Sequence, residues 1–330
     1  MTPVYSLVIP IYNEEAVLPM LLRRLDALLD ALDAPAEAIF VDDGSRDASS
    51  IVLEAKARAD RRYRFVKLSR NFGHQIAITT GMERATGDAV IVMDADLQDP
   101  PEVVLDMIAK WKEGYQVVYA ERLSREGESR FKRAAAGLFY RLLGKLSEVE
   151  IPRNVGDFRL VDRKALDAFL AMPERDRFVR GMFAWIGFRQ TVAPFHRPPR
   201  AAGRTKYSLT KMLRLAVDGV VSFSDAPLRV ALWAGLAIST LAIFYGVWVI
   251  AQWAMNANLA RGWSSIIVLM AFLGGANMLM TGVMGVYVGR IYAEVKRRPL
   301  YIVDKTVGFE AGAEAPATRR EAYAASAKHG

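Results

Sequence analysis

The sequence contains no cysteine and only three histidines, His74, His196 and His329, which are far apart along the chain. The absence of cysteine excludes disulfide bonds and thiolate metal sites. The wide spacing of the histidines argues against a zinc cluster or a Ser-His-Asp triad. Neither G-x-G-x-x-G nor G-x-x-x-x-G-K-[ST] occurs, which argues against a dinucleotide oxidoreductase and a P-loop NTPase.

Charged residues are missing from two long segments, residues 230–260 and 262–289. Each segment exceeds the roughly 20 apolar residues that a helix needs to cross a bilayer. We therefore predict two transmembrane helices, at about residues 230–255 and 264–290. Lysine and arginine cluster outside the pair, and only Arg261 lies between the two segments. The positive-inside bias then places both flanks in the cytoplasm and makes the protein multi-pass.

The net charge of +8 is concentrated in two basic stretches, residues 122–145 and 196–214. Nucleic acid, an anionic membrane or a phosphate substrate would each explain such stretches. The apolar segments favour the membrane and the phosphate and argue against nucleic acid. Within the stretches, residues 131–146 and 207–221 mix basic and apolar side chains at near-helical spacing. They predict helices in the headgroup layer, although helices of a protein core show the same pattern.

The first 120 residues alternate between strand and helix patterns. We expect helices at residues 14–32, 49–59, 75–85 and after Pro100 and Pro101, and strands at residues 4–11, 38–41, 63–68, 89–93 and 116–120. This order predicts an α/β domain with a parallel sheet covered on both faces. We place that soluble domain at residues 1–226, the membrane pair at 227–292 and a partly disordered cytoplasmic tail at 293–330.

Polar side chains follow four successive strands of the predicted sheet. Helix caps would account for one or two of them. Ligands of parallel sheets gather at the carboxyl ends of the strands, so four polar ends predict a nucleotide site. The residues are Tyr12, Asn13, Glu14 and Glu15; Asp42, Asp43, Gly44 and Ser45; Ser69 to Gly73; and Asp94, Asp96 and Gln98.

Asp94 and Asp96 leave a buried strand one residue apart, and Gln98 follows closely. Mg²⁺ or Mn²⁺ takes oxygen ligands and needs few of them from protein, which leaves room for diphosphate oxygens. An isolated Asp-X-Asp is more often a strand end followed by a turn, here with Asp99 as a helix cap. The other polar strand ends favour the metal site.

Three motifs in this order resemble the family-two inverting glycosyltransferases with the GT-A fold: residues 8–15, 41–45 and 94–98. The closer resemblance is to the polyprenyl-phosphate glycosyltransferases. This group includes dolichol-phosphate mannose synthase and the bacterial undecaprenyl-phosphate glucosyl- and aminoarabinosyl-transferases. Residues 71–75, residues 156–160 and the late pair of apolar segments are similar to the bacterial members. The resemblance covers about residues 4 to 300.

The resemblance implies a GT-A domain with a Rossmann-like, mostly parallel sheet, and it implies roles for particular residues. Metal ligands would be Asp94, Asp96 and Gln98. Catalytic groups would be Asp96, Asp157, Arg204 and Lys206. Substrate-binding residues would be Pro10, Tyr12, Asn13, Glu14, Val41, Asp42, Asp43, Ser45, Asn71, Gln75, Asp94, Ala95, Arg159, Arg200 and Tyr207. Asp157 would activate or orient the acceptor; alternatively, it forms only a salt bridge with Arg159 or Arg153.

The implied reaction is metal-dependent, inverting transfer of a hexose from a nucleotide sugar to a polyprenyl phosphate at the bacterial inner membrane. UDP-glucose and undecaprenyl phosphate are the first expectations. UDP-linked N-acetylhexosamine, aminoarabinose and GDP-mannose follow as donors. A lipid phosphate is largely dianionic at neutral pH and needs no strong base. The rivals are a processive polysaccharide synthase, whose Gln-X-X-Arg-Trp motif is absent, and a non-enzymatic membrane tether. Small residues at Gly282, Gly285 and Gly289 allow helices to approach closely, within the pair or in a homo-oligomer.

Overall fold

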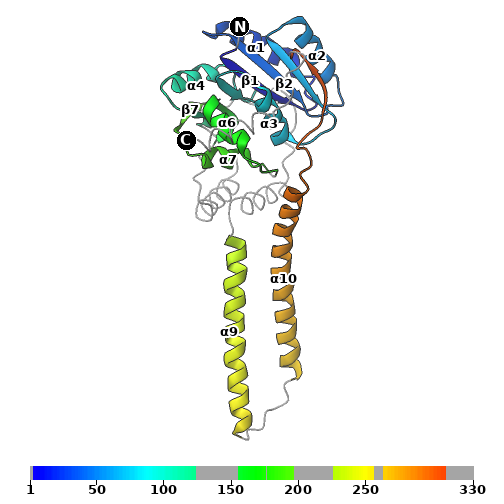
Figure 1. The fold of residues 1–330 in the computed structure, drawn as a ribbon, viewed down its shortest axis with the longest axis vertical. Coiled ribbons are helices and arrows are strands. Elements are labelled where there is room, and N and C mark those ends of the chain that lie inside the picture. Colours follow the sequence, from blue (N-terminus) through cyan, green and yellow to red (C-terminus); the bar gives the residue numbers. More distant parts are fainter. Residues whose placement is uncertain (1–2, 124–154, 176, 197–225, 256–262, 310–330) are drawn as a thin grey trace, which may run out of the picture. The chain divides into compact units, whose positions relative to one another are not determined.

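The computed structural model describes residues 3–123, 155–175, 177–196, 226–255 and 263–309 (Figure 1). These residues fall into two compact units. The first unit contains the described residues up to 196 together with 298–309. The second contains the two long helices and ends at Arg297. The segments predicted as interfacial helices, 131–146 and 207–221, lie outside the described residues.

The first unit is built on a sheet whose strands lie in the order β7-β5-β6-β4-β1-β2-β3-β8 (Figure 1). Strands β4, β1, β2 and β3 are mutually parallel, and so are β5 and β7; β6 and β8 run antiparallel to their neighbours. The predicted mostly parallel α/β sheet is confirmed. The elements are β1 Tyr5–Ile11, α1 Leu18–Ala31, β2 Ala36–Asp42, α2 Ser49–Ala59, β3 Tyr63–Leu68, α3 His74–Arg84, β4 Ala89–Val92, α4 Val103–Lys112, β5 Val117–Arg122, β6 Val155–Asp162, α6 Arg163–Ala171, α7 Val179–Trp185, β7 Gln190–Phe195 and β8 Val303–Val307.

The first helix begins later than its periodicity predicts. We expected a helix from residue 14, whereas α1 begins at Leu18. The Glu14 amide donates to Ser49 Oγ at 3.0 Å and the Glu15 amide donates to Asp47 Oδ2 at 3.2 Å, so these two residues are bound to the segment after β2. The residues between β1 and α1 therefore form a loop at the carboxyl end of the strand, where a ligand can be met.

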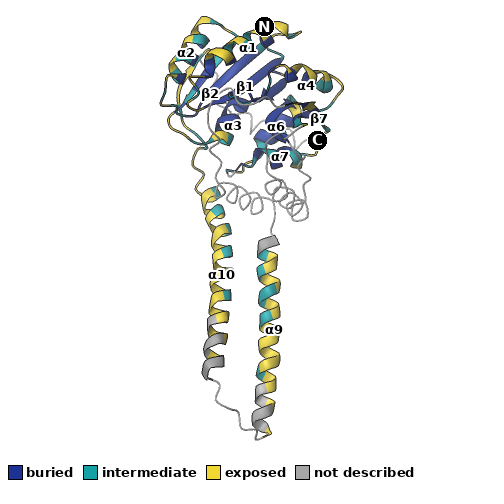
Figure 2. Ribbon diagram, turned by 180° about the vertical axis from the view of Figure 1, so that it is seen from behind, coloured by how far each residue is buried: buried dark blue, intermediate teal, exposed yellow. Residues whose placement is uncertain are grey.

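Helices cover both faces of the sheet, and alternate residues of each strand serve the two faces. Tyr5, Leu7 and Ile9 of β1 join one buried cluster with apolar residues of α1 and α4. The intervening Val8 faces α3, where Gly81 lets the helix approach closely. Figure 2 shows the strands dark with burial between exposed outer helix faces. Because helices cover both faces, the polar side chains of the sheet that remain exposed lie at the strand ends.

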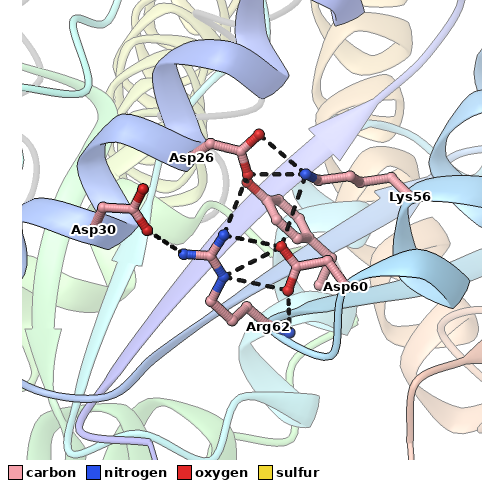
Figure 3. Close-up of polar contacts among 6 residues, drawn as sticks. Asp26, Asp30, Lys56, Asp60 and Arg62 are labelled. Atoms are coloured by element: carbon pink, nitrogen blue, oxygen red, sulfur yellow. Dashed lines mark hydrogen bonds and ion pairs between the residues drawn. The ribbon is translucent and has the colours of Figure 1, made fainter.

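A network of ion pairs joins α1, α2 and the start of β3, and it connects Asp26, Asp30, Lys56, Asp60, Arg62 and Tyr63 (Figure 3). Arg62 lies 2.6 Å from Asp30 and 2.9 Å from Asp60. The Tyr63 hydroxyl donates to Asp26 at 2.7 Å. Each carboxylate has a cationic partner at the amino end of β3, away from the polar strand ends. This cluster therefore serves packing between helices.

The second unit consists of α9 Ala226–Ala254 and α10 Trp263–Val295. The segments Leu228–Trp248 and Phe272–Val295 are long and apolar enough to cross a membrane, and none of either segment is buried. The two predicted helices are confirmed as helices, and their lengths and composition suit a membrane pair. Gly235 of α9 lies against Met280 of α10, with 3.7 Å between a built Cβ and the methionine Cε.

The small-residue face of α10 does not pack against the described part of α9. A Cβ atom built on Gly282, Gly285 or Gly289 meets no described atom within 4 Å. At these three glycines, the described part of α9 therefore does not approach α10 closely. A homo-oligomer stays a prediction.

The chain returns to the sheet after α10 and adds a strand to its edge. We placed residues 293–330 in a tail, whereas residues 298–309 belong to the first unit and β8 pairs with β3. The Ser69 amide donates to the Ile302 carbonyl at 2.9 Å. The Tyr301 hydroxyl donates to buried Glu83 at 2.5 Å. These contacts cap the edge of β3.

Replacement of Tyr301 by phenylalanine should destabilise the first unit. The change removes a donor from the buried carboxylate of Glu83, which costs about 1–2 kcal/mol. Lys305→Ala is the control, because its ion pair with Glu54 lies at the surface, where such pairs add little to stability. Urea unfolding of both purified variants measures the difference. Equal stability of Tyr301→Phe and the unchanged protein would contradict a stabilising role for this contact.

Candidate active site

The antiparallel pairing of β4 and β6 brings two acidic positions to the same edge of the sheet. Val92, the last residue of β4, is the register partner of Arg159 in β6. Asp94 follows Val92 by two residues, and Asp157 precedes Arg159 by two residues. Because the strands run in opposite directions, these two carboxylates lie across from each other at the carboxyl end of β4.

The loops after β2 and β3 are joined through Asp43. Its buried carboxylate accepts hydrogen bonds from the backbone amides of Phe72 at 2.7 Å and Gly73 at 2.9 Å. Burial raises the pKa of Asp43, and the two amide bonds oppose that rise. Gly44 follows in a left-handed conformation at φ 73°, against the backbone of Asn71. The side chain of Asn71 is exposed beside this junction.

The loops after β1 and β2 are also interlocked. The Asn13 amide donates to Ser45 Oγ at 3.0 Å, and the Arg46 amide donates to Asn13 Oδ1 at 2.8 Å. The Glu14 amide donates to Ser49 Oγ at 3.0 Å. With its backbone fixed in this way, the loop after β1 forms a rigid part of the sheet edge.

Tyr12 follows β1 directly, and its aromatic ring is exposed beside these loops. Pro10 of β1 and Val41 of β2 are register partners, and both are buried. Asp42 is fully buried and accepts hydrogen bonds from the Ser45 amide at 2.8 Å and from the Ser50 hydroxyl. Asp42 therefore shapes the loop, and Tyr12 offers an aromatic face of the kind on which a base can stack.

Asp157 is held by groups from three elements. Arg180 of α7 donates from Nε to Oδ1 at 2.9 Å and from Nη2 to Oδ2 at 3.2 Å. Arg159 donates to Oδ1 at 3.2 Å, and Gln75 donates to Oδ2 at 3.1 Å. Burial opposes charge on Asp157, but the Arg180 guanidinium and its other partners hold its pKa well below the usual range. Asp157 is therefore a permanent anion and a weak base.

His74 connects the two carboxylates. Its Nε2 atom lies 3.3 Å from Asp94 Oδ1 and 3.5 Å from Asp157 Oδ2. Burial disfavours the charged imidazole, but Asp157 and Asp94 together raise the pKa of His74 to about 9. The side chain keeps 46% of its surface exposed. Its charge is thus available at the opening of the site at neutral pH.

The acidic loop after β4 fits a divalent cation. Asp94 Oδ1 is buried and accepts no hydrogen bond from the described residues, and burial raises the pKa of Asp94. Leu97 has a left-handed backbone at φ 58°, and the Gln98 amide donates to Asp96 Oδ1 at 3.0 Å, so the loop is tightly turned. Within the described residues, no group of three His, Cys, Asp or Glu side chains is arranged to hold a metal ion by itself. A cation in this loop would therefore take further ligands from a diphosphate.

Most of the predicted site residues in the described part of the chain lie along this edge. Arg159 differs, because its side chain is 0% exposed and lies over the rings of Tyr119 and Phe183. It contacts Asp157 from below and has no surface for a substrate. Ala95 is buried in the acidic loop. Four predicted residues lie outside the described residues: Arg200, Arg204, Lys206 and Tyr207.

Two residues of the cluster were not predicted as site residues. His74 lies inside a motif that carries the resemblance, but the spacing of the histidines argued only against zinc and a triad. Arg180 lies in no motif, and nothing in the sequence indicates that α7 turns it toward β6. Of the two salt bridges considered for Asp157, the one with Arg159 forms at 3.2 Å; Arg153 lies outside the described residues.

Comparison with known proteins agrees with this geometry. The profile of glycosyl transferase family 2 matches residues 6–170, which contain the loops after β1, β2, β3 and β4. The chain belongs to glycosyl transferase family 2. It is accordingly a glycosyltransferase, and its α/β sheet is the GT-A fold that the motifs predicted.

The family-2 relatives match nearly the whole chain. An uncharacterised glycosyltransferase of Bacillus subtilis (strain 168) is 48% identical over 306 residues, covering 93% of this chain and 95% of the relative. A prophage bactoprenol glucosyl transferase homologue of Escherichia coli (strain K12) is 39% identical over 300 residues, covering 91% and 98%. Among solved structures, glucosyl-3-phosphoglycerate synthase of Mycobacterium tuberculosis has a TM-score of 0.47 at 24% identity, covering 67% of this chain and 79% of that chain.

Two glycines with the same backbone angle provide a matched test of the junction between the loops. Gly44 and Gly187 have φ of 73° and 72°, but a Cβ at Gly44 would lie 2.6 Å from the Arg70 carbonyl carbon, whereas Gly187 has open space. Gly187→Ala should cost about 1–2 kcal/mol for the left-handed backbone alone. Gly44→Ala should cost about 1–3 kcal/mol more, because the loop after β3 must move.

Chemical unfolding of both variants checks this expectation. Gly44→Ala should lower the free energy of unfolding by clearly more than Gly187→Ala does. Equal destabilisation by the two substitutions would show that the loops are not tightly joined.

Proposed function

We propose that this glycosyltransferase transfers glucose, with inversion, from UDP-glucose to a polyprenyl phosphate, of which undecaprenyl phosphate is the first choice. The observation that carries the proposal is the sheet edge that joins interlocked loops after β1, β2 and β3 to an acidic loop and a cationic cluster. Two long apolar helices in the same chain support a membrane acceptor. Relatives named bactoprenol glucosyl transferase, 39–40% identical over 90–91% of the chain, support glucose and the polyprenyl lipid.

In this proposal the donor lies along the loops after β1, β2 and β3. Tyr12 and Asp43 bind the nucleoside, and the buried residues Pro10 and Val41 support these loops from strands β1 and β2. Asp94, Asp96 and Gln98 would hold Mg²⁺ or Mn²⁺, and the bound ion would supply positive charge to the leaving diphosphate. Arg200, Arg204, Lys206 and the neighbouring Tyr207 remain predicted phosphate ligands.

The acceptor phosphate needs to be oriented, and it does not need to be deprotonated by a base. A phosphate monoester is largely dianionic at neutral pH and is already a nucleophile. Asp157 has a pKa well below its usual range and is surrounded by donors, so it cannot take a proton at neutral pH. We assign it an orienting role. Inverting transfer then needs the acceptor oxygen on the side of the sugar opposite the diphosphate.

We further propose that α9 and α10 cross the bacterial inner membrane and leave the sheet on the cytoplasmic side. The supporting observations are the length and composition of the helices and the basic residues outside them. A processive polysaccharide synthase is the rival enzyme, and it would differ in its product. Membranes incubated with radiolabelled UDP-glucose, other nucleotide sugars and undecaprenyl phosphate should yield one lipid carrying one sugar. A polymer would contradict the proposal.

Loss of the Asp96 charge should reduce turnover by a factor on the order of 10² or more, comparable to losing a preorganised electrostatic stabiliser. Asp96→Asn should leave the unfolding midpoint nearly unchanged, because a carboxylate at the sheet edge contributes little packing. Asp88→Asn, an exposed carboxylate ahead of the same strand, is the control and should keep full activity. EDTA should abolish transfer, and Mn²⁺ or Mg²⁺ should restore it. Full activity in EDTA would refute the metal site.

Reporter fusions test the membrane arrangement. A cytoplasm-active reporter after Gly330 and an export-dependent reporter at Asn258 should both give signal. The reason is that the basic residues lie before α9 and after α10 in the chain, and such residues stay in the cytoplasm. The same reporters exchanged between the two positions serve as controls and should be silent. Export of the reporter after Gly330 would contradict the proposed orientation.

A further inference from the structure

Arg70 is an exposed arginine in the loop after β3, and no described carboxylate lies within ion-pair distance of its guanidinium. The contacts of that guanidinium are with its own loop. Nη1 donates to the Asn71 carbonyl at 3.2 Å, and Cζ lies 4.1 Å from the centre of the Phe72 ring. Since arginine carries several N–H donors in one plane, most of the donors of Arg70 are left for another molecule.

The backbone of Arg70 lies against the loop after β2, beside Asp43. A Cβ built on Gly44 would be 2.6 Å from the Arg70 carbonyl carbon and 3.0 Å from its Cα. Asp43, the residue before Gly44, accepts hydrogen bonds from the amides of Phe72 and Gly73. The guanidinium of Arg70 is packed on the same Phe72 whose amide Asp43 binds. Arg70 and Asp43 are therefore fixed relative to each other through one short segment.

The strand order places Arg70 away from the acidic loop after β4. Strands β1 and β2 lie between β4 and β3, so three strand spacings, roughly 14 Å, separate the ends of β4 and β3. The chain comes back to the acidic loop at His74, whose Nε2 atom lies 3.3 Å from Asp94 Oδ1, whereas Arg70 lies at the other end of that segment. A nucleotide whose diphosphate lies at the end of β4 therefore has its base near the ends of β2 and β3.

We propose that Arg70 binds the base of the donor, and that its guanidinium donates to a carbonyl oxygen of the uracil ring. Uracil presents carbonyl oxygens at its edge, and a planar guanidinium suits acceptors that lie in the plane of a base. The contacts with Phe72 and Asn71 hold the guanidinium in place before the nucleotide arrives, which lowers the cost of ordering a long side chain. The assignment rests on the proposed function, because it names the residue that recognises the base of the proposed donor.

Arg70→Ala in the full-length protein tests this contact. Equilibrium binding of UDP in the presence of Mn²⁺ should weaken about 10-fold, because a hydrogen bond from a charged donor is lost. Inorganic pyrophosphate with Mn²⁺ has no base, and its binding should stay within about twofold of that of the unchanged protein. Arg70→Lys should recover only part of the loss, because an ammonium group lacks the planar donors of a guanidinium.

Sulfur analogues of the base test the contact at the level of the atom. In the thio-UDP analogues, sulfur replaces one or the other ring carbonyl oxygen and is a weaker hydrogen-bond acceptor. The unchanged protein should bind one of these analogues about 3-fold or more weakly than UDP. Arg70→Ala should bind that analogue and UDP alike.

Arg61→Ala is the matched control. Arg61 is likewise exposed and has no ion pair with a described carboxylate, but it lies just before β3, at the opposite end of the strand. Both substitutions remove one positive charge, so a general attraction of the anionic nucleotide would weaken in both variants. Arg61→Ala should leave the binding of UDP and pyrophosphate unchanged. If Arg70→Ala does not fold, as judged by thermal unfolding, Arg70→Gln takes its place with the same measurements.

Three results would overturn the assignment. An equal loss for UDP and pyrophosphate would assign Arg70 to the diphosphate, and unchanged UDP binding by Arg70→Ala would remove Arg70 from the donor site. Equal binding of UDP and both thio analogues by the unchanged protein would exclude a hydrogen bond to the ring carbonyls. The proposed function fails separately. If the unchanged protein binds UDP but transfers no glucose to undecaprenyl phosphate, the proposed reaction is wrong; if it transfers glucose and Arg70→Ala binds UDP as tightly, only this inference fails.

Discussion

The pairing of β4 with β6 is the constraint on which the site depends. Four parallel strands alone would bring the loops after β1 to β4 to one edge, as in any sheet of this kind. The antiparallel β6 adds a residue that approaches the edge from the other direction. The register Val92 with Arg159 places Asp157 across from Asp94. A shift by one residue would turn Asp157 to the opposite face of the sheet and separate the two carboxylates.

The balance of charge follows from that pairing. Two carboxylates brought together in a partly buried place repel each other, and each would be costly without a counter-ion. The two carboxylates, Asp157 and Asp94, have different partners. Asp157 is contacted by two guanidinium groups, an amide and the imidazole of His74 and remains ionised. Among the described residues, the cation that contacts the Asp94 carboxylate is that same imidazole, and burial raises the pKa of Asp94. The oxygens of Asp157 are therefore occupied by protein donors, whereas Asp94 Oδ1 accepts no hydrogen bond from the described residues.

Much of this arrangement could be predicted from the sequence because it is local. Apolar runs bounded by polar turns predicted β1, β3 and β4 nearly to the residue, and the strand-end motifs predicted the loops of the site. The start of α1 was misjudged because helical periodicity does not reveal that the Glu14 and Glu15 amides donate to side chains of Ser49 and Asp47. Arg180 and β8 were missed for another reason. Their partners, Asp157 and β3, are distant in the chain, and only the folded topology brings them together.

The late position of β8 has a consequence for the synthesis of the protein. A ribosome completes strands β1 to β7 long before it reaches residue 303, because α9 and α10 are made in between. Until then the edge of β3 is unpaired, and an unpaired edge is a template for association with other chains. The nascent domain must be shielded while the apolar helices emerge. A fragment that stops before α9 would keep that edge open permanently, so a well-behaved soluble version needs a covalent graft of residues 298–309.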